Sequence, residues 1–279
     1  METTAAVDYG YLRQVVFDVS QNVLDASRDY LFDTRLTRVL RNQGMTHLDE
    51  LVRKLRMQKN PSLEREVAEA MTINETSFFR DLRPFDLLRQ ELLPKIIEAR
   101  RFHRTLRLWS AACATGQEAY SLAMMLLEHF PMLVGWNIVI EGTDICNEVV
   151  DRARAGRYHR IEINRGLPAR YVVRYFDHIG EDWIVKPEVR KMCSFRQANL
   201  CGPSLPFNRA TDSFDVIFLR NVMLYFDLPT RRTLMSGVHH LLAPDGILFL
   251  GSSEQPVDMS TWSPVLTAGT CYFKPRQPS

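Results

Sequence analysis

Hydrophobic residues in the first hundred positions recur at intervals of three and four, the spacing of one face of an α-helix. Segment 11–27 shows this spacing clearly, and so do segments 33–41, 48–56, 63–71 and 85–99. Gly44 is a predicted helix end, and Pro61 a predicted helix start. The first part of the chain is therefore expected to be helical.

From about Thr105 the pattern changes to short apolar runs that alternate with helical segments. Strands are predicted over 106–111, 136–142, 214–219 and 246–250, and helices over 117–130, 147–155 and 229–242. Strand and helix in alternation with short links are typical of a doubly wound parallel sheet. Pro244-Asp245-Gly246 is a turn signal that ends the last helix, and 271–273 is predicted to be a final, antiparallel edge strand. The predicted fold class is therefore α/β.

Residues 158–201 fit this rhythm poorly, because they are polar and contain short alternating pieces such as 183–186 and 189–195. Alternation of apolar and polar residues is the pattern of a half-buried strand. We therefore predict an insertion that carries a small sheet.

Composition limits the class of protein. The 279 residues, 46% of them hydrophobic, can form one large domain with a satellite or two modest domains. No run of about 18 apolar residues and no secretory signal is present, so no membrane insertion is expected. The five cysteines lack C-x-x-C spacing, which argues against disulfides and a metal site and favours a cytoplasmic location. A net charge of +2 gives no argument for nucleic acid.

In open α/β sheets, ligands bind beyond the carboxyl ends of the strands, so those ends are the candidate site. After the first strand come mostly small residues, including Ala112 and Gly116, which let a ligand lie close to the backbone. The G-x-G-x-x-G pattern of a nicotinamide oxidoreductase is absent. Glu118 in the first helical turn would repel a pyrophosphate but attract an ammonium, such as that of S-adenosyl-L-methionine. Alternatively, Glu118 is an acid that stabilises the helix start.

Three further strand ends carry polar side chains. Asp144 can accept hydrogen bonds from ribose hydroxyls or cap the following helix. Asn199 has an amide that can pair with an adenine edge, although asparagine in a loop also serves turns. Arg220 and Asn221 directly follow a strongly apolar strand, which indicates polar groups placed at a site, with a surface loop as the alternative.

These strand ends, in this order, resemble the CheR-type chemotaxis receptor glutamate methyltransferases. The resemblance is carried by Asn74-Glu75-Thr76-Ser77-Phe78-Phe79-Arg80, Trp109–Glu118, Gly142-Thr143-Asp144-Ile145 and Arg220–Phe226, with support from Leu242–Gly246 and Gly251-Ser252-Ser253-Glu254. It covers nearly the whole chain. It implies a Rossmann-like class I methyltransferase sheet over 91–279, an N-terminal helical, receptor-docking domain over 1–90, and an inserted antiparallel β-subdomain at about 158–196.

The resemblance also implies roles for individual residues. Cofactor contacts are expected from Asn74, Thr76, Arg80, Ala112, Gly116, Glu118, Asp144, Ile145, Asn199, Leu200, Arg220 and Asn221. Within this set, Glu118 would hold the methionyl ammonium of S-adenosyl-L-methionine and Asp144 its ribose, while Asn199 and Leu200 would border the adenine. Catalytic roles are expected for Arg80, Arg220 and Tyr225.

The implied reaction makes glutamate methyl esters on chemoreceptors and releases S-adenosyl-L-homocysteine, for chemotactic adaptation. A glutamate side chain has a pKa of about 4.3, so at neutral pH it is already a nucleophile and needs no general base. The enzyme must align the carboxylate and strip water from it. We expect Arg80 or Arg220 to orient the carboxylate, and Tyr225 to supply a hydrogen bond or a wall.

The helical region is locally basic, with Arg35, Arg38 and Arg41 as candidates for docking the acidic methylation helices of chemoreceptors. The turn at 178–182 is short and has one glycine, which argues against binding of a receptor tether peptide through the β-subdomain. We expect a monomer. The rival interpretations are a methyltransferase that acts on a small molecule or a nitrogen atom, and a non-catalytic cofactor-binding signalling scaffold.

Overall fold

The computed structural model describes residues 7–202, 205–208 and 211–276, which form two compact units. The helical unit contains the described residues up to Ile73 together with Leu224–Thr230. The sheet unit contains Asn74–Met223 and the chain from Arg231 onwards.

The helical unit is built from short helices around one apolar core. They are α1 (Tyr9–Ser20), η1 (Ala26–Arg28), α2 (Tyr30–Arg35), α3 (Thr37–Asn42), α4 (Leu48–Met57) and α5 (Pro61–Ala70). The helix expected over 11–27 is too long. It ends at Ser20, whose hydroxyl donates to the Val16 carbonyl over 2.7 Å, and Gln21 follows in the left-handed region at φ 59°.

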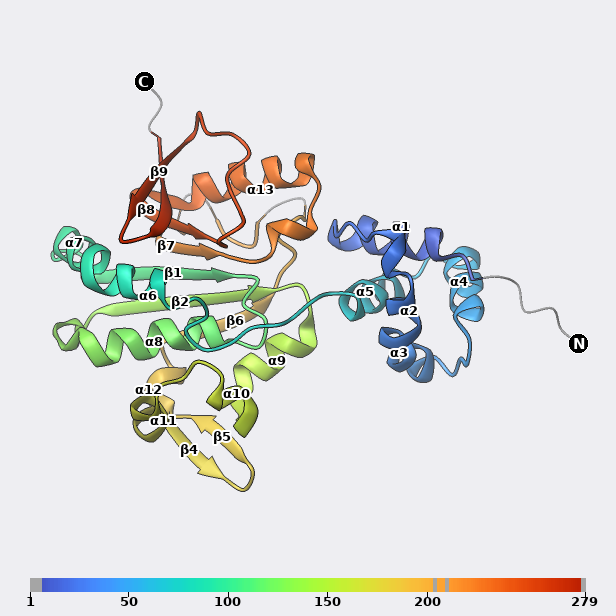
Figure 1. Cartoon of the computed structure of the whole chain (residues 1–279), viewed down its shortest axis with the longest axis horizontal. Coiled ribbons are helices and arrows are strands. Elements are labelled where there is room, and N and C mark those ends of the chain that lie inside the picture. Colours follow the sequence, from blue (N-terminus) through green and yellow to red (C-terminus); the bar gives the residue numbers. More distant parts are fainter. Residues whose placement is uncertain (1–6, 203–204, 209–210, 277–279) are drawn as a thin grey trace, which may run out of the picture. The chain divides into compact units, whose positions relative to one another are not determined.

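The sheet unit contains the expected doubly wound sheet (Figure 1). Its strands are β1 (Thr105–Ala111), β2 (Asn137–Asp144), β6 (Cys193–Gln197), β7 (Phe214–Leu219), β8 (Leu242–Leu250), β9 (Trp262–Thr267) and β10 (Thr270–Pro275). Across the described residues their order is β6-β2-β1-β7-β8-β10-β9, and all neighbours are parallel except the pairs that involve β10. The order reverses between β1 and β7, where such sheets bind their ligands.

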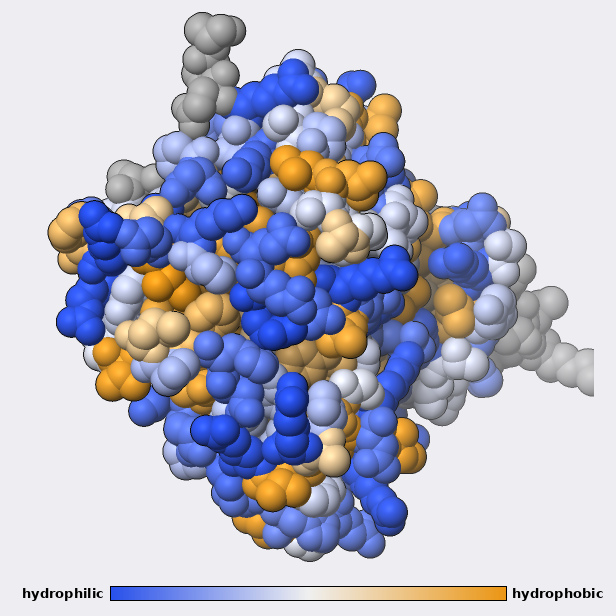
Figure 2. All heavy atoms as spheres, turned by 60° about the vertical axis from the view of Figure 1, so that its left-hand side comes forward, coloured by the Kyte–Doolittle hydropathy of each residue, from blue (hydrophilic) through white to orange (hydrophobic). Residues whose placement is uncertain are grey.

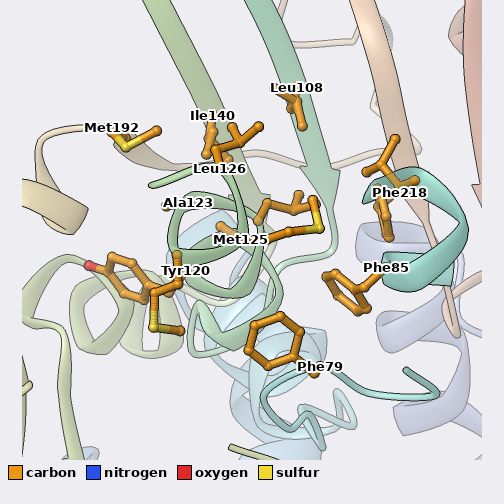
Figure 3. Packing of buried hydrophobic residues seen from close by; sticks show 14 of the residues in the cluster. Phe79, Phe85, Leu108, Tyr120, Ala123, Met125, Leu126, Ile140, Met192 and Phe218 are labelled. Carbon is orange, nitrogen blue, oxygen red and sulfur yellow. The ribbon is translucent and has the colours of Figure 1, made fainter. Parts of the chain in front are cut away.

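Helices pack on this sheet. They are α6 (Arg83–Leu87), the π-helical η2 (Leu88–Leu92), α7 (Leu93–Ala99), α8 (Gln117–His129), η3 (Pro131–Leu133) and α9 (Asn147–Ala155). The chain passes between the units within η4 (Met223–Tyr225) and α13 (Leu228–Leu241). Helix α8 is buried along most of its length, and Figure 3 shows its Ala123, Met125 and Leu126 against Leu108 and Ile140 of the strands behind it. This packing fixes the turn between β1 and α8.

Residues 74–90 belong to the sheet unit and not, as expected from the sequence, to the N-terminal domain, and their Phe78, Phe79, Phe85, Leu87 and Leu88 lie in its core. The ring centroids of Phe79 and Phe85 are 5.3 Å apart, and Phe85 lies 5.4 Å from Phe218 of β7 (Figure 3). Amphipathic spacing shows that such a segment has an apolar face, but not which core buries it. The compact units therefore divide after Ile73.

The insertion carries the expected antiparallel sheet, of order β3-β5-β4 among the described residues. Its elements are β3 (Arg157–His159), α10 (Arg160–Asn164), α11 (Ala169–Tyr175), β4 (Phe176–Ile179), β5 (Asp182–Val185) and α12 (Pro187–Arg190). The interpretation of 189–195 as part of this sheet was wrong. The first residues of this segment belong to the end of α12, a helix that begins at Pro187. The last residues of the segment belong to β6 of the large sheet.

The end of the chain also differs from expectation. Strand β10 is antiparallel as predicted, but it lies inside the sheet, and the edge strand is β9. Pro264 and the exposed Leu266 weaken the apolar signal of β9, and proline is tolerated at a sheet edge. Pro244 and Asp245 lie within β8, at an irregularity where its register against β7 shifts.

Hydrophobic residues at the surface are dispersed. In the face that Figure 2 shows, orange hydrophobic atoms form small groups among blue hydrophilic ones. The large apolar residues that are most exposed, such as Phe102, Ile161 and Val173, come from separate elements. Among the described residues, no helix is long and apolar enough to cross a membrane.

Candidate functional site

The turn between β1 and α8 has an unusual backbone that is tied to the end of β2. Ala112 and Ala114 have φ values of 60° and 47°, a region that non-glycine residues enter at a cost. The Cys113 N–H donates to the Thr143 carbonyl over 2.9 Å, and the Ala114 N–H donates to Asp144 Oδ2 over 2.9 Å. Neighbouring strand ends therefore hold the turn in shape.

Gly116 closes this turn and begins the approach to α8. Its φ is 92°, and a Cβ here would lie 2.9 Å from Ala153 Cβ and 3.2 Å from Phe195 Cζ. Both the backbone conformation and the space therefore require glycine. Without a bulkier side chain, the turn packs directly on α9 and β6.

Asp144, at the carboxyl end of β2, is only 6% exposed. Besides the Ala114 N–H, its carboxylate accepts the Cys146 N–H over 3.0 Å, just before α9 begins. The turn after β6 lies beside it, since the Ala198 N–H donates to the Asp144 carbonyl over 2.8 Å. Asp144 thus connects three strand ends, and Ile145 follows it, half-buried.

The most distinctive feature of the site is an arginine between two acids. Arg220 Nη1 donates to Glu118 Oε2 over 3.2 Å, and Nη2 donates to Asp81 Oδ2 over 2.6 Å. Glu118 Oε1 also accepts the Ser110 hydroxyl over 2.7 Å. Burial raises the pKa of Glu118 above its ordinary value, while Arg220, the Ser110 hydrogen bond and Arg80 oppose this rise.

The side chain of Arg220 is almost completely buried, which is unusual for an arginine. Its side chain is 2% exposed, and its Nε has no hydrogen-bond partner among the described residues. A buried polar atom without a partner costs free energy, although the Nε atoms of Arg107 and Arg196 share this state among the described residues, so it is the burial of Arg220 that distinguishes it. Sequence reasoning selected Arg220 and Glu118 but missed Asp81, whose only signal was its place directly after the Arg80 motif.

The segment that carries Asp81 is anchored to α8. The Phe79 N–H donates to the Ser121 hydroxyl over 2.9 Å, and Phe79 and Asp81 both have positive φ values. Arg80 lies between them and donates to the Glu75 carbonyl over 2.9 Å. Asn74 and Thr76, on the same segment, are half-buried. The predicted residues of this segment therefore lie in the sheet unit, with Arg80 close enough to influence Glu118.

Asn199 and Leu200 follow β6, at the same sheet edge as Asp144. Asn199 Oδ1 accepts the Cys201 N–H over 2.9 Å, which is the turn role weighed in the sequence analysis. Leu200 is 8% exposed. Their contact with an adenine stays a prediction.

Asn221 continues the chain beyond Arg220 with a φ of 59°. Its N–H and that of Val222 donate to the carboxylate of Glu254, over 2.8 and 2.9 Å. Glu254 belongs to the Gly251-Ser252-Ser253-Glu254 motif, but sequence reasoning gave it no individual role.

A pocket of about 760 Å³ opens beside this cluster, wholly within the sheet unit. It is lined by Asp81, Leu82, Arg83, Pro84, Arg220, Leu250, Gly251, Ser252, Glu254, Gln255, Leu266, Gly269, Thr270, Cys271 and Phe273. Arg220 lines this pocket together with residues at the end of β8. The same side chain also contacts Glu118 of α8, the helix that follows β1.

The remaining candidates belong to the helical unit. The Tyr225 carbonyl accepts the Val23 N–H over 2.8 Å, and the catalytic role of its side chain stays a prediction. Arg35 donates to the carbonyls of Met71 and Thr72, both over 3.0 Å, at the end of α5. It therefore stabilises that helix end, whereas Arg38 and Arg41 are exposed on α3.

Comparison with known proteins identifies the family of the chain. Residues 74–271 match the family model described as "CheR methyltransferase, SAM binding domain", which begins where the sheet unit begins. Chemotaxis protein methyltransferase 1 of Pseudomonas aeruginosa is 38% identical over 256 residues, which cover 90% of this chain and 91% of that protein. Chemotaxis protein methyltransferase Cher2 of Pseudomonas putida is 35% identical over the same shares. Chemotaxis protein methyltransferase 1 of Vibrio cholerae is 34% identical, with 83% of each chain covered.

Proposed function

Since the chain belongs to the CheR methyltransferase family and is an S-adenosylmethionine-dependent methyltransferase of chemotaxis, we propose that its acceptors are glutamate carboxylates of chemoreceptors. The products are glutamate methyl esters and S-adenosylhomocysteine. The observation that carries this choice of acceptor is Arg220, a buried cation that lines a pocket open to a carboxylate.

The residues at the strand ends fit the cofactor. The carboxylate of Glu118 is mostly buried at the start of α8, with 13% of the side chain exposed, where it suits the ammonium of the methionyl group. Asp144 is an acid at the end of β2, where a ribose hydroxyl can donate to it. Gly116 lets the turn before α8 pack on α9 and β6, which holds the Glu118 and Asp144 ends of the site together. When bound, the cofactor supplies an electrophilic methyl group.

The acceptor carboxylate needs no general base, because it is ionised at neutral pH. Among the described residues gathered around Glu118 there is no histidine. Cys113 is buried, and burial raises the pKa of its thiol well above the ordinary value, so it stays protonated and is not a nucleophile. The chain's task is to orient the acceptor and exclude water.

Arg220 orients the acceptor carboxylate through an electrostatic attraction that is weaker than a full ion pair. Its charge is already shared by Glu118 and Asp81, so it attracts an entering carboxylate without fully neutralising it. A full ion pair would reduce the nucleophilicity of the acceptor oxygen. Arg80 adds positive potential, and Tyr225 supplies a hydrogen bond or a wall at the acceptor.

Docking of the receptor uses the basic surface of the helical unit at Arg38 and Arg41. The double charge reversal Arg38→Glu with Arg41→Glu raises the KM for receptor about 10-fold or more, because charge reversal replaces attraction by repulsion, and leaves cofactor affinity unchanged. The matched control reverses Lys95 and Lys191, which are exposed on the sheet unit. An equal KM for both double variants would contradict the docking role.

The other expectations about partners follow the same proposal. The protein acts as a cytoplasmic monomer on the methylation helices of receptors. The β4–β5 turn has Gly180 and Glu181 between its strands, and this short turn argues against capture of a tether peptide.

A base-lability assay tests the proposed acceptor. The protein is incubated with methyl-labelled S-adenosylmethionine and chemoreceptor cytoplasmic fragments, and the product is treated with mild base. A carboxyl methyl ester releases volatile labelled methanol, whereas an N-methyl group does not. Label that resists base, or no label on any receptor fragment, would overturn the proposal.

A further inference from the structure

Glu254 is a buried acid that the reaction described above does not use. It follows β8 and is 7% exposed. Its Oε2 accepts the N–H groups of Gly251 and Asn221 over 2.7 and 2.8 Å, and its Oε1 accepts the N–H of Val222 over 2.9 Å. One carboxylate therefore joins the end of β8 to the segment that leaves β7.

The geometry around this carboxylate leaves little freedom. A Cβ on Gly251 would lie 2.5 Å from Glu254 Oε2 and 3.0 Å from the Asn221 nitrogen. Asn221 is held at a φ of 59°, which asparagine tolerates better than most residues. The N–H groups of Asn221 and Val222 converge on Glu254 in this conformation, so the acid and the backbone shape depend on each other.

We propose that Glu254 is a positioning residue for methyl transfer: by binding the backbone of Asn221 and Val222, it fixes the segment on which Arg220 is mounted. Arg220 contacts Glu118 and Asp81 with its side chain, but its main chain needs a separate anchor at the end of β7. Glu254 supplies that anchor from β8, and both residues line the same pocket. The inference rests on methyl transfer and not on which acceptor is used.

The chemistry of the donors calls for a carboxylate. Three N–H groups point at two oxygens, and a carboxylate presents acceptor positions on both. A glutamine of the same shape must direct its NH₂ group at one set of these donors, which removes one or two hydrogen bonds and places donor against donor. An aspartate keeps the charge but is one methylene shorter, so it cannot reach both strand ends.

The test compares Glu254→Gln and Glu254→Asp with the wild-type protein and with Val238→Ala, a cavity variant in the buried face of α13. We expect both Glu254 variants to lose about 10- to 100-fold in kcat at saturating cofactor, because small misplacements of catalytic groups have costs of this order. The affinity for S-adenosylhomocysteine, measured by calorimetry, falls less than about 5-fold, because Glu118 and Asp144 are untouched. Val238→Ala lowers the melting temperature but keeps kcat near the wild-type value.

A second measurement does not depend on the acceptor. Amide hydrogen exchange, followed by NMR, reports the N–H groups of Asn221, Val222 and Gly251 directly, and we expect all three to lose protection in Glu254→Gln. The positioning role would be overturned if the three amides of Glu254→Gln exchange as slowly as in the wild-type protein. It would also be overturned if the Glu254 variants lose no more kcat than Val238→Ala does. If the wild-type protein methylates no receptor fragment, the proposed acceptor fails, while the exchange result still decides the role of Glu254.

Discussion

An arginine that contacts two carboxylates lies near each end of strand β7. We call these two groups the Arg100 bridge and the Arg220 bridge, and they differ. Near the amino-terminal end of β7, Arg100 donates through Nε to Asp215 over 2.7 Å and through Nη1 and Nη2 to Asp245 over 2.9 and 2.6 Å. After its carboxyl end, Arg220 contacts Glu118 and Asp81. An arginine between two acids is thus found near both ends of this strand.

The first bridge is satisfied and the second is not. All three nitrogens of Arg100 have partners, and its side chain is 20% exposed. The Nε of Arg220 has no partner among the described residues, and its side chain is 2% exposed. Taking a charge out of water is costly even when it is paired with two acids, so an arginine as deeply buried as Arg220 is expected where its position serves the site.

The carboxylates respond differently too. In the Arg100 bridge, a hydrogen bond from Arg100 lowers the pKa of Asp245, whereas burial raises the pKa of Asp215. Burial raises the pKa of Glu118 even though Arg220 lies beside it. Glu118 is thus an anion that would gain from a further positive group, which the ammonium of the cofactor provides. Burial thus raises the pKa of one acid in each bridge, and what distinguishes the bridges is that Arg220 lines the pocket and Arg100 does not.

The largest expected difference comes from removing each arginine. Arg220→Gln lowers kcat/KM for methylation at least about 100-fold, since it removes a charged donor from the reacting centre. It also lowers the free energy of unfolding by about 3 kcal/mol, because Glu118 is left buried without its cation. Methylation rates and chemical denaturation measure the two effects.

Arg100→Gln is the matched variant at the other end of the strand. It lowers the free energy of unfolding by about 1–3 kcal/mol through loss of its charged hydrogen bonds. Its kcat/KM, measured on the folded fraction, stays within about 2-fold of wild type, because the bridge touches no site residue. If both variants lose activity equally, the division into a structural and a functional bridge is wrong.

The sequence indicated several residues of the Arg220 bridge individually, but it did not indicate which of them contact each other. The apolar run of β7 was predicted with the bounds observed, and Arg220 stood out because it follows that run. Gly116 and Glu118 were found because a turn between strand and helix has a limited set of suitable residues. Periodicity and turn chemistry act between neighbours in the chain, so such features are visible without a fold.

Other features depend on contacts between distant segments. Asp81 lies in a loop with positive φ and shows no periodic pattern, and its pairing with Arg220 spans most of the sheet unit. Glu254 was part of a recognised motif, but its three donors come from two strand ends that only the fold brings together. Strand β9 was missed because its exposed face and Pro264 hide the apolar alternation.

A smaller effect is expected from Asp81, the acid that sequence reasoning missed. Asp81→Asn keeps a hydrogen-bond acceptor but removes a half-exposed charge, an interaction of about 0.2–1 kcal/mol. Arg220 then pairs more strongly with Glu118 and competes with the cofactor ammonium, so the affinity for S-adenosylhomocysteine falls about 2- to 5-fold. Asp212→Asn, which breaks the ion pair with Arg107, is the control and should leave this affinity unchanged. Equal affinities for the two variants in calorimetry would remove Asp81 from the site.

The smallest effect is a pH dependence of stability with opposite sign for two carboxylates, Asp245 of the Arg100 bridge and Glu118 of the Arg220 bridge. The pKa of Asp245 is lowered by folding, so this group stabilises the protein above its ordinary value of 3.8 and the contribution is lost as pH falls through the lowered pKa. The pKa of Glu118 is raised by folding, so its stability contribution is present below the ordinary value of 4.5 and is lost as pH rises through the raised pKa. Relative to wild type, Glu118→Gln should therefore gain stability as pH rises from about 4 to about 7, apart from a constant offset for the loss of a partner of Arg220. Asp245→Asn should lose stability relative to wild type mainly as pH rises from about 2 to about 5, by under about 1 kcal/mol because Asp245 is half-exposed, so the full range to be measured is about 2 to about 7. Denaturant unfolding of both variants across this range measures the slopes, and slopes of the same sign would mean that Glu118 is held as a structural anion and not as a group awaiting a cation.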